Sequence, residues 1–159
     1  MTATAPTTRR GITLPGIVLG IGMGGFVDGI ALHQLLQWHH LLTSRYPENT
    51  VDGLRMNTLA DGLFHTVTWL AVLIGLGMLY SRITADRSTV WRSRELWGSM
   101  LIGWGLFNLV EGVVDHHLLG IHHVHGGPHQ LWWDLGFLAF GAVLVAAGWL
   151  LRRGSGDRR

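Results

Sequence analysis

Four apolar runs dominate the chain, and they cover residues of about 12–37, 57–80, 96–118 and 130–151. Each run is close to the ~20 residues that a helix needs to cross the hydrocarbon core of a bilayer. Segments such as AVLIGLGMLY (71–80) are apolar on every side, whereas the helices of a soluble bundle keep a polar stripe. The sequence therefore predicts an all-α integral membrane protein, with four transmembrane helices in a single membrane domain over residues 1–159.

The arginines predict how the helices are oriented. All 12 basic residues are arginine. Two precede the first run, four lie in the 81–95 connection, four follow the last run, and the 117–129 loop has none. By the positive-inside rule, both termini face the cytoplasm and the loops 38–56 and 117–129 face outward. The first run is longer than a signal-peptide core, and no A-x-A-like site follows it, so we expect a retained span.

An internal repeat connects the two halves of the chain. Residues 28–40 (DGIALHQLLQWHH) and 111–123 (EGVVDHHLLGIHH) align without gaps and share a glycine, a histidine, two leucines and a final histidine pair. A weaker similarity relates HTVTW (65–69) to HQLWW (129–133). We therefore expect a bundle built from two tandem helical-hairpin repeats, at about 12–80 and 96–151, related by a pseudo-twofold axis along the membrane normal.

The ionisable residues inside the spans all fall in the outer halves of the predicted helices. A carboxylate in a span costs at least about 2.5–3.5 kcal/mol, so these acids must face one another, water or a cation. A divalent metal neutralises such a group while histidine supplies nitrogen ligands. Because the chain has no cysteine, any metal site must use nitrogen and oxygen. The predicted ligands, or groups orienting them, are His33, His65, His116, His129, Asp28, Asp61, Glu111 and Asp115.

The metal is Fe, Cu, Zn or Mn on this donor set, which does not choose between them. On a straight α-helix, Asp28 and His33 are separated by roughly 7.5 Å along the axis. We therefore expect them not to share one metal, with the acids lying deeper than the histidines. A further set of histidines is predicted near the water interface, as an outer rim that relays metal or is only solvated: His39, His40, His122, His123 and His125.

Several functions are compatible with this pattern. The first is a membrane-embedded metal-binding protein with one or two metals, with a redox or oxygen-handling reaction as one form of it. The others are a b-type cytochrome with haem between the spans, a transporter or delivery factor for metal or protons, and a polar network that only joins helices. No phosphate-binding loop, nucleophile elbow or nucleic-acid module is present. The expected partners are the lipid bilayer and a metal donor or acceptor on the outer face, and not nucleic acid.

Glycines at 16, 20 and 24 form a stripe with four-residue spacing, which predicts close packing between helices. Three longer motifs, GFVDGIALHQLLQWHHL, ADGLFH and NLVEGVVDHHLLGIHHV, resemble a bacterial family of predicted four-span membrane proteins. The resemblance covers nearly the whole chain outside the termini. It implies a protein of the bacterial inner membrane, but it implies no activity, so function must be inferred from the residues themselves.

Overall fold

The computed structural model describes residues 11–154 and contains four long helices. Two of them change from α- to π-helical geometry before they end. The elements are α1 (Thr13–Val27) continued by η1 (Asp28–Leu35), α2 (Val51–Ala85), α3 (Ser93–Glu111) continued by η2 (Gly112–Leu118), and α4 (Gln130–Arg153). All four helices are long and apolar enough to cross a membrane, and the described residues include no strand. The predicted all-α membrane fold is confirmed.

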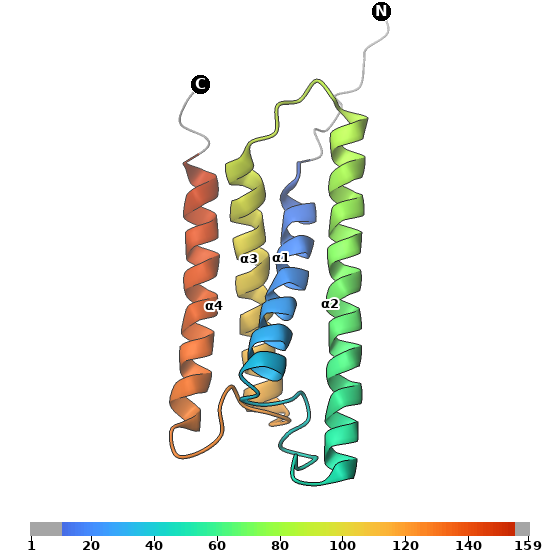
Figure 1. The fold of residues 1–159 in the computed structure, drawn as a ribbon. Helices are drawn as coiled ribbons and strands as arrows, with labels where there is room; N and C mark the ends of the chain where they lie inside the picture. The colour runs from blue at the N-terminus through green and yellow to red at the C-terminus, as the bar shows by residue number, and fades with distance from the viewer. Residues whose placement is uncertain (1–10, 155–159) are drawn as a thin grey trace, which may run out of the picture.

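The helices lie side by side in the order α2, α1, α3 and α4 (Figure 1). α1 and α3 pack against each other at the centre, α2 packs on α1, and α4 packs on α3. Within residues 11–154, α2 and α4 make no contact with each other. The two loops that follow η1 and η2 lie together at the end of the molecule opposite α1's start and α4's end. The arginines at 9, 10, 158 and 159, which contribute to the predicted orientation, lie outside the described residues.

Glycines allow the central helices to approach at backbone distance. A Cβ atom added to Gly20 would collide with the carbonyl oxygen of Met100, and one added to Gly103 would collide with that of Ile17. These contacts are equivalent under a shift of 83 residues, which takes 20 to 103 and 17 to 100. Gly16 and Gly24 likewise lie against Ser99 and Trp104 of α3. The packing role predicted for the glycine stripe is therefore confirmed.

The outer helices follow the same symmetry with a different shift. A Cβ atom on Gly22 would approach the carbonyl oxygen of Thr68 at 2.8 Å, and one on Gly105 would approach that of Gly141 at 2.5 Å. Thr68 and Gly141 are 73 residues apart, so the second copy is shorter by ten residues before its outer helix. The structural partner of His65 is consequently Leu138. The proposed match of HTVTW with HQLWW is wrong, because an ungapped comparison cannot see the shorter loop.

Each π-helical segment ends in the same turn. The N–H of Leu36 donates to the carbonyl of Ala31, and that of Leu119 donates to Val114, both at 2.8 Å and both across five residues. The next residue then has a positive φ, 50° at Gln37 and 56° at Gly120. A left-handed backbone suits glycine and strains other residues. The first copy therefore carries strain that the second copy avoids.

We expect Gln37→Gly to stabilise the protein and Gly120→Ala to destabilise it, each by about 1 kcal/mol, because a left-handed residue other than glycine costs roughly 1–2 kcal/mol. The free energy of unfolding in detergent micelles measures both changes. Gly126→Ala is the control, since a Cβ there meets nothing within 4 Å and its φ is not positive. Substitutions at 37 and 120 that shift stability in the same direction would contradict the shared turn geometry.

Candidate metal centre

Two groups of three buried side chains lie at the loop end of the helices. In each group, one ligand atom per residue lies within 4.8 Å of the others. Each group contains one carboxylate and two histidines, and the two groups correspond residue for residue under the 83-residue shift. The first triad is Asp28, His33 and His39, and the second triad is Glu111, His116 and His122.

The π-helices bring the first two members of each triad together. A π-helix closes its hydrogen bonds over five residues, so residues i and i+5 lie on the same face. Asp28 and His33 have this spacing, and His33 Nε2 lies 3.1 Å from Asp28 Oδ2. Glu111 and His116 have the same spacing in η2. The expectation that Asp28 and His33 cannot share a metal is therefore wrong, because it assumed an α-helix through both residues.

The third member of each triad comes from the loop that follows. His39 is 2% exposed and His122 is 0% exposed, and their rings stack at 4.7 Å between centroids with 6° between planes. The sequence placed both at a solvated rim, and this placement is wrong. The loops fold back beneath the helix ends and carry the two histidines into the interior.

Hydrogen bonds across the pseudo-twofold axis fix the orientation of these two histidines. His39 Nδ1–H donates to the carbonyl oxygen of Val124 at 2.9 Å, and His122 Nδ1–H donates to that of Leu41 at 3.1 Å. Since a carbonyl oxygen can only accept, the proton must lie on Nδ1. Nε2 is then left with a free lone pair in each ring, and this is the form of histidine that binds a metal.

Several of the candidate ligand atoms are buried without a hydrogen-bond partner among the described residues. They include Nε2 of His39 and His122 and both carboxylate oxygens of Glu111. The nearest ion-pair distance in this set is 3.6 Å, from His122 Nε2 to Glu111 Oε1. Leaving a buried polar group unsatisfied costs about 1–3 kcal/mol. The atoms without partners are thus the ones that a metal would coordinate, and the donor set fits such an ion.

Burial keeps the two loop histidines neutral at pH 7. It lowers the pKa of His39 to about 4, against the opposing attraction of the Asp28 carboxylate. Burial also lowers the pKa of His122 to about 3, and proximity to His39 lowers it further. Neutral imidazole is the metal-binding form, so no proton has to leave either ring at neutral pH before a metal binds.

Two further carboxylates hold the helical histidines from behind. Asp61 Oδ1 lies 3.0 Å from His33 Nδ1, and its Oδ2 lies 2.6 Å from His40 Nδ1. Asp134 repeats the arrangement, with 3.3 Å to His116 Nδ1 and 2.7 Å to His123 Nδ1. A carboxylate behind a metal-binding histidine orients the ring and raises its basicity. This geometry suits Asp61 and Asp134 to an orienting role.

Each of these carboxylates also anchors the loop above it. The backbone N–H of Leu41 donates to Asp61 Oδ1 at 2.9 Å, and that of Val124 donates to Asp134 Oδ1 at 3.0 Å. Asn57 further secures the first loop by accepting from the N–H of Leu42 at 3.0 Å. Asp134 was not among the predicted site residues. The signal that identifies it is its match to Asp61 under the 73-residue shift.

The remaining candidates lie outside both triads. His65 Nδ1 donates to the backbone carbonyl of Asp61 at 2.7 Å, and His129 is exposed at the N-cap of α4. Asp115 is partly buried but belongs to neither triad. His125 Nδ1 donates to the carbonyl of Gly126 at 2.7 Å. Of the eight predicted ligands, the structure therefore brings together Asp28, His33, Glu111 and His116, with Asp61 behind His33.

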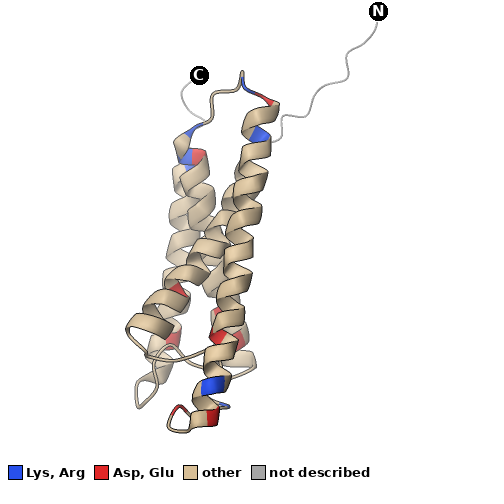
Figure 2. Ribbon diagram, turned by 45° about the vertical axis from the view of Figure 1, so that its right-hand side comes forward, with Lys and Arg blue, Asp and Glu red and all other residues tan. Residues whose placement is uncertain are grey.

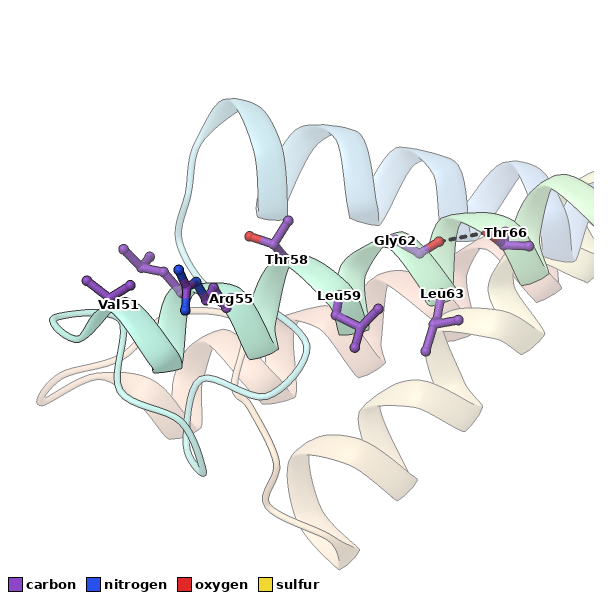
Figure 3. A pocket seen from close by; sticks show the side chains of 8 residues that line it. Val51, Arg55, Thr58, Leu59, Gly62, Leu63 and Thr66 are labelled. Carbon is purple, nitrogen blue, oxygen red and sulfur yellow. Dashed lines mark hydrogen bonds between the residues drawn. The ribbon is translucent and has the colours of Figure 1, made fainter.

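The charge distribution separates the two ends of the molecule (Figure 2). Acidic residues gather in the half nearest the two loops, whereas arginines are concentrated around the opposite end, with a few near the loops. A large hollow of about 640 Å³ lies elsewhere, on one face of α2 from Val51 to Thr66 (Figure 3). All the residues lining it come from that helix and its walls are mostly apolar, so it offers no set of converging ligands.

Comparison with known proteins identifies the family but not the chemistry. No curated protein and no solved structure matches the chain. Residues 15–155, which include all four helices almost completely and both triads, match the family described as predicted membrane protein (DUF2243). Together with the four span-length helices, this match shows that the chain belongs to the DUF2243 family of predicted membrane proteins.

Proposed function

We propose that the protein binds two transition-metal ions within the membrane, one in each triad. The observation that carries this proposal is the duplication of one buried carboxylate and two histidines, with unpartnered histidine Nε2 atoms at equivalent positions in both copies. Isolated buried carboxylates in a bilayer are costly, and a divalent cation offsets this cost better than a network of hydrogen bonds. The orienting carboxylates, Asp61 and Asp134, support the same conclusion.

The donor set favours a reactive site over a purely structural one. Two histidines and one carboxylate leave coordination positions open, as in catalytic zinc sites and in non-haem iron oxygenases. Fe, Mn, Zn and Cu(II) all accept these ligands. An open site near the water interface suits a redox or oxygen-handling reaction, and the protein would then be a membrane metalloenzyme.

Haem binding and transport are less well supported. The His39 and His122 rings stack at 4.7 Å, and His33 lies 4.6 Å from His39, which leaves no slot for a porphyrin between them. A transporter needs a polar route to the opposite end of the helices. Deep in that direction the buried polar side chains of the described residues are Thr68 and Ser99, and each hydroxyl donates to a carbonyl of its own helix.

The orienting carboxylates provide a direct test. We expect Asp61→Asn and Asp134→Asn each to weaken metal binding by about 10–100-fold, the usual effect of losing an outer partner of a histidine ligand. Titration with Co²⁺, followed by its visible spectrum and by competition with a chelator, measures the affinity. Asp52→Asn is the control, because Asp52 is exposed on α2, away from the triads. Unchanged affinity in both variants would overturn the proposed orienting role.

We also propose that the protein lies in the bacterial inner membrane with both termini in the cytoplasm. The arginines near the start of α3 and the end of α4 support this orientation, since short cytoplasmic loops and tails are enriched in basic residues. A reporter enzyme fused after residue 159 should then be active only in its cytoplasmic form. Activity of a periplasm-dependent reporter at the same position would reverse the orientation and place the triads near the cytoplasm.

A further inference from the structure

A groove beside the first triad breaks the symmetry of the molecule. It has a volume of about 320 Å³ and runs between η1 and α4 over the surface of α3. α1 and α4 make no contact within residues 11–154, so the groove opens sideways between them. Val27 and Phe140 at its edges are 41% and 48% exposed, which places its mouth toward the lipid.

The walls of the groove are aromatic in one copy of the repeat only. Trp38, Trp104, Trp133 and Phe140 line it, together with Phe137. At the equivalent positions of the other half, the shifts of 83 and 73 residues place Ile121, Ile21, Ala60 and Val67. The triads are conserved between the two halves of this chain while the groove is not. The aromatic wall is therefore not a requirement of the fold or of the metal site.

Two polar groups lie along this otherwise apolar wall. Asn108 is 2% exposed and lines the groove, and its side-chain amide makes no hydrogen bond with the described residues. Asp28 of the first triad lines it too, and its Oδ2 lacks a hydrogen-bond partner. A buried amide without a partner is costly, so this one is suited to donate to an oxygen of a bound molecule. The repeat partner of Asn108 is Gly25, which packs against Thr68.

We propose that this groove binds a lipid-soluble quinone or quinol, with its ring between the aromatic side chains and an oxygen hydrogen-bonded to Asn108. Aromatic walls favour a flat ring, and the side opening leads to the bilayer, where such molecules dissolve. The inference deepens the proposed function and rests on it in one respect: Asp28 lines both the groove and the first triad, so the ligand lies next to the metal. Binding itself does not require the metal.

Gly136 makes the groove testable without disturbing the fold. It lines the groove, and a Cβ atom placed there meets nothing within 4 Å. Its partner in the other copy is Leu63. Gly136→Leu therefore fills the groove with the side chain that the other half already carries. Gly77→Leu is the matched control, because Gly77 also has open space around it and lies on α2 outside the groove.

The experiment uses the full chain in detergent, purified metal-free, with decylubiquinone as the probe and quenching of tryptophan fluorescence as the readout. Wild type and Gly77→Leu should show the same saturable quenching, and Gly136→Leu should weaken it at least tenfold. Asn108→Leu should weaken it about threefold to tenfold, the effect of one hydrogen bond. Dodecane, which has a chain but no ring or oxygen, should compete poorly.

Equal quenching in Gly136→Leu and wild type would overturn the quinone site, and so would full competition by dodecane, which indicates a slot for an acyl chain. A change of oligomeric state in Gly136→Leu, seen by light scattering, would assign the groove to a second copy of the chain. Quinone binding by a protein that never takes up metal would refute the metal proposal alone. Metal binding without quinone binding would refute this inference alone.

Discussion

Replacing either loop histidine should remove one of two bound metal ions. We expect His39→Ala or His122→Ala to retain one metal per chain after dialysis, and the double variant to retain none. The reason is that each triad has only three protein ligands, so losing one leaves a carboxylate and a single histidine. The affinity of the damaged site should fall by more than about 100-fold, beyond the effect of removing an outer partner. Elemental analysis of purified protein measures the result.

His117→Ala is the matched control for these variants. His117 is adjacent to His116 in sequence, but it is exposed and belongs to neither triad. It should keep both metals. Because His39→Ala and His122→Ala also remove a hydrogen bond between the loops, circular dichroism and thermal unfolding of the metal-free proteins must show that the fold persists. Two metals retained by a folded double variant would contradict the assignment of His39 and His122 as ligands.

Gly20→Leu should prevent the central helices from packing. A Cβ at this position already collides with the carbonyl oxygen of Met100, and backbone atoms of α3 cannot move aside as a side chain does. Overpacking typically costs about 1–3 kcal/mol, and we expect this variant to exceed that range. Gly103→Leu should behave alike, because it is the symmetry partner and meets the carbonyl of Ile17.

Gly77→Leu is again the control, since nothing lies within 4 Å of a Cβ there. Thermal unfolding in detergent should show its midpoint near that of wild type, while Gly20→Leu and Gly103→Leu unfold far earlier or fail to accumulate. A Gly20→Leu protein as stable as Gly77→Leu would mean that α1 and α3 do not cross at these glycines.

The sequence was sufficient to predict the helices and half of each triad, and the reason lies in which signals are local. Length and uniform hydrophobicity predict the spans, and the repeat pairs Asp28 with Glu111 and His33 with His116. The five-residue spacing within these pairs is itself the signal of a π-helix. It seemed to argue against a shared site because an α-helix was assumed for both segments.

The loop histidines and Asp134 required three-dimensional information. His39 and His122 follow the spans, in positions where histidine is normally solvated. They are buried because each loop turns sharply at Gln37 or Gly120 and its backbone is tied to a carboxylate on the outer helix of its own copy. Asp134 escaped notice because the two copies differ in length by ten residues, which hides its correspondence with Asp61 in an ungapped alignment.

The duplicated site and the single groove together suggest how the two halves divide their roles. The triads repeat with the same residue types apart from aspartate in one and glutamate in the other, whereas the groove exists with aromatic walls at the first triad. If both proposals hold, two equivalent metals would face different surroundings, and only the metal at Asp28 would lie beside a lipid-soluble ligand.

The measurement that tests the metal centre most directly is the metal-to-protein ratio of the purified full chain after saturation and removal of loosely bound ions. Inductively coupled plasma mass spectrometry gives the metal, and amino-acid analysis gives the protein. Two equivalent triads predict a ratio of two after loading with the preferred transition metal. A chain that is folded and binds no transition metal, under any of Fe, Mn, Zn or Cu loading, would contradict the proposed function.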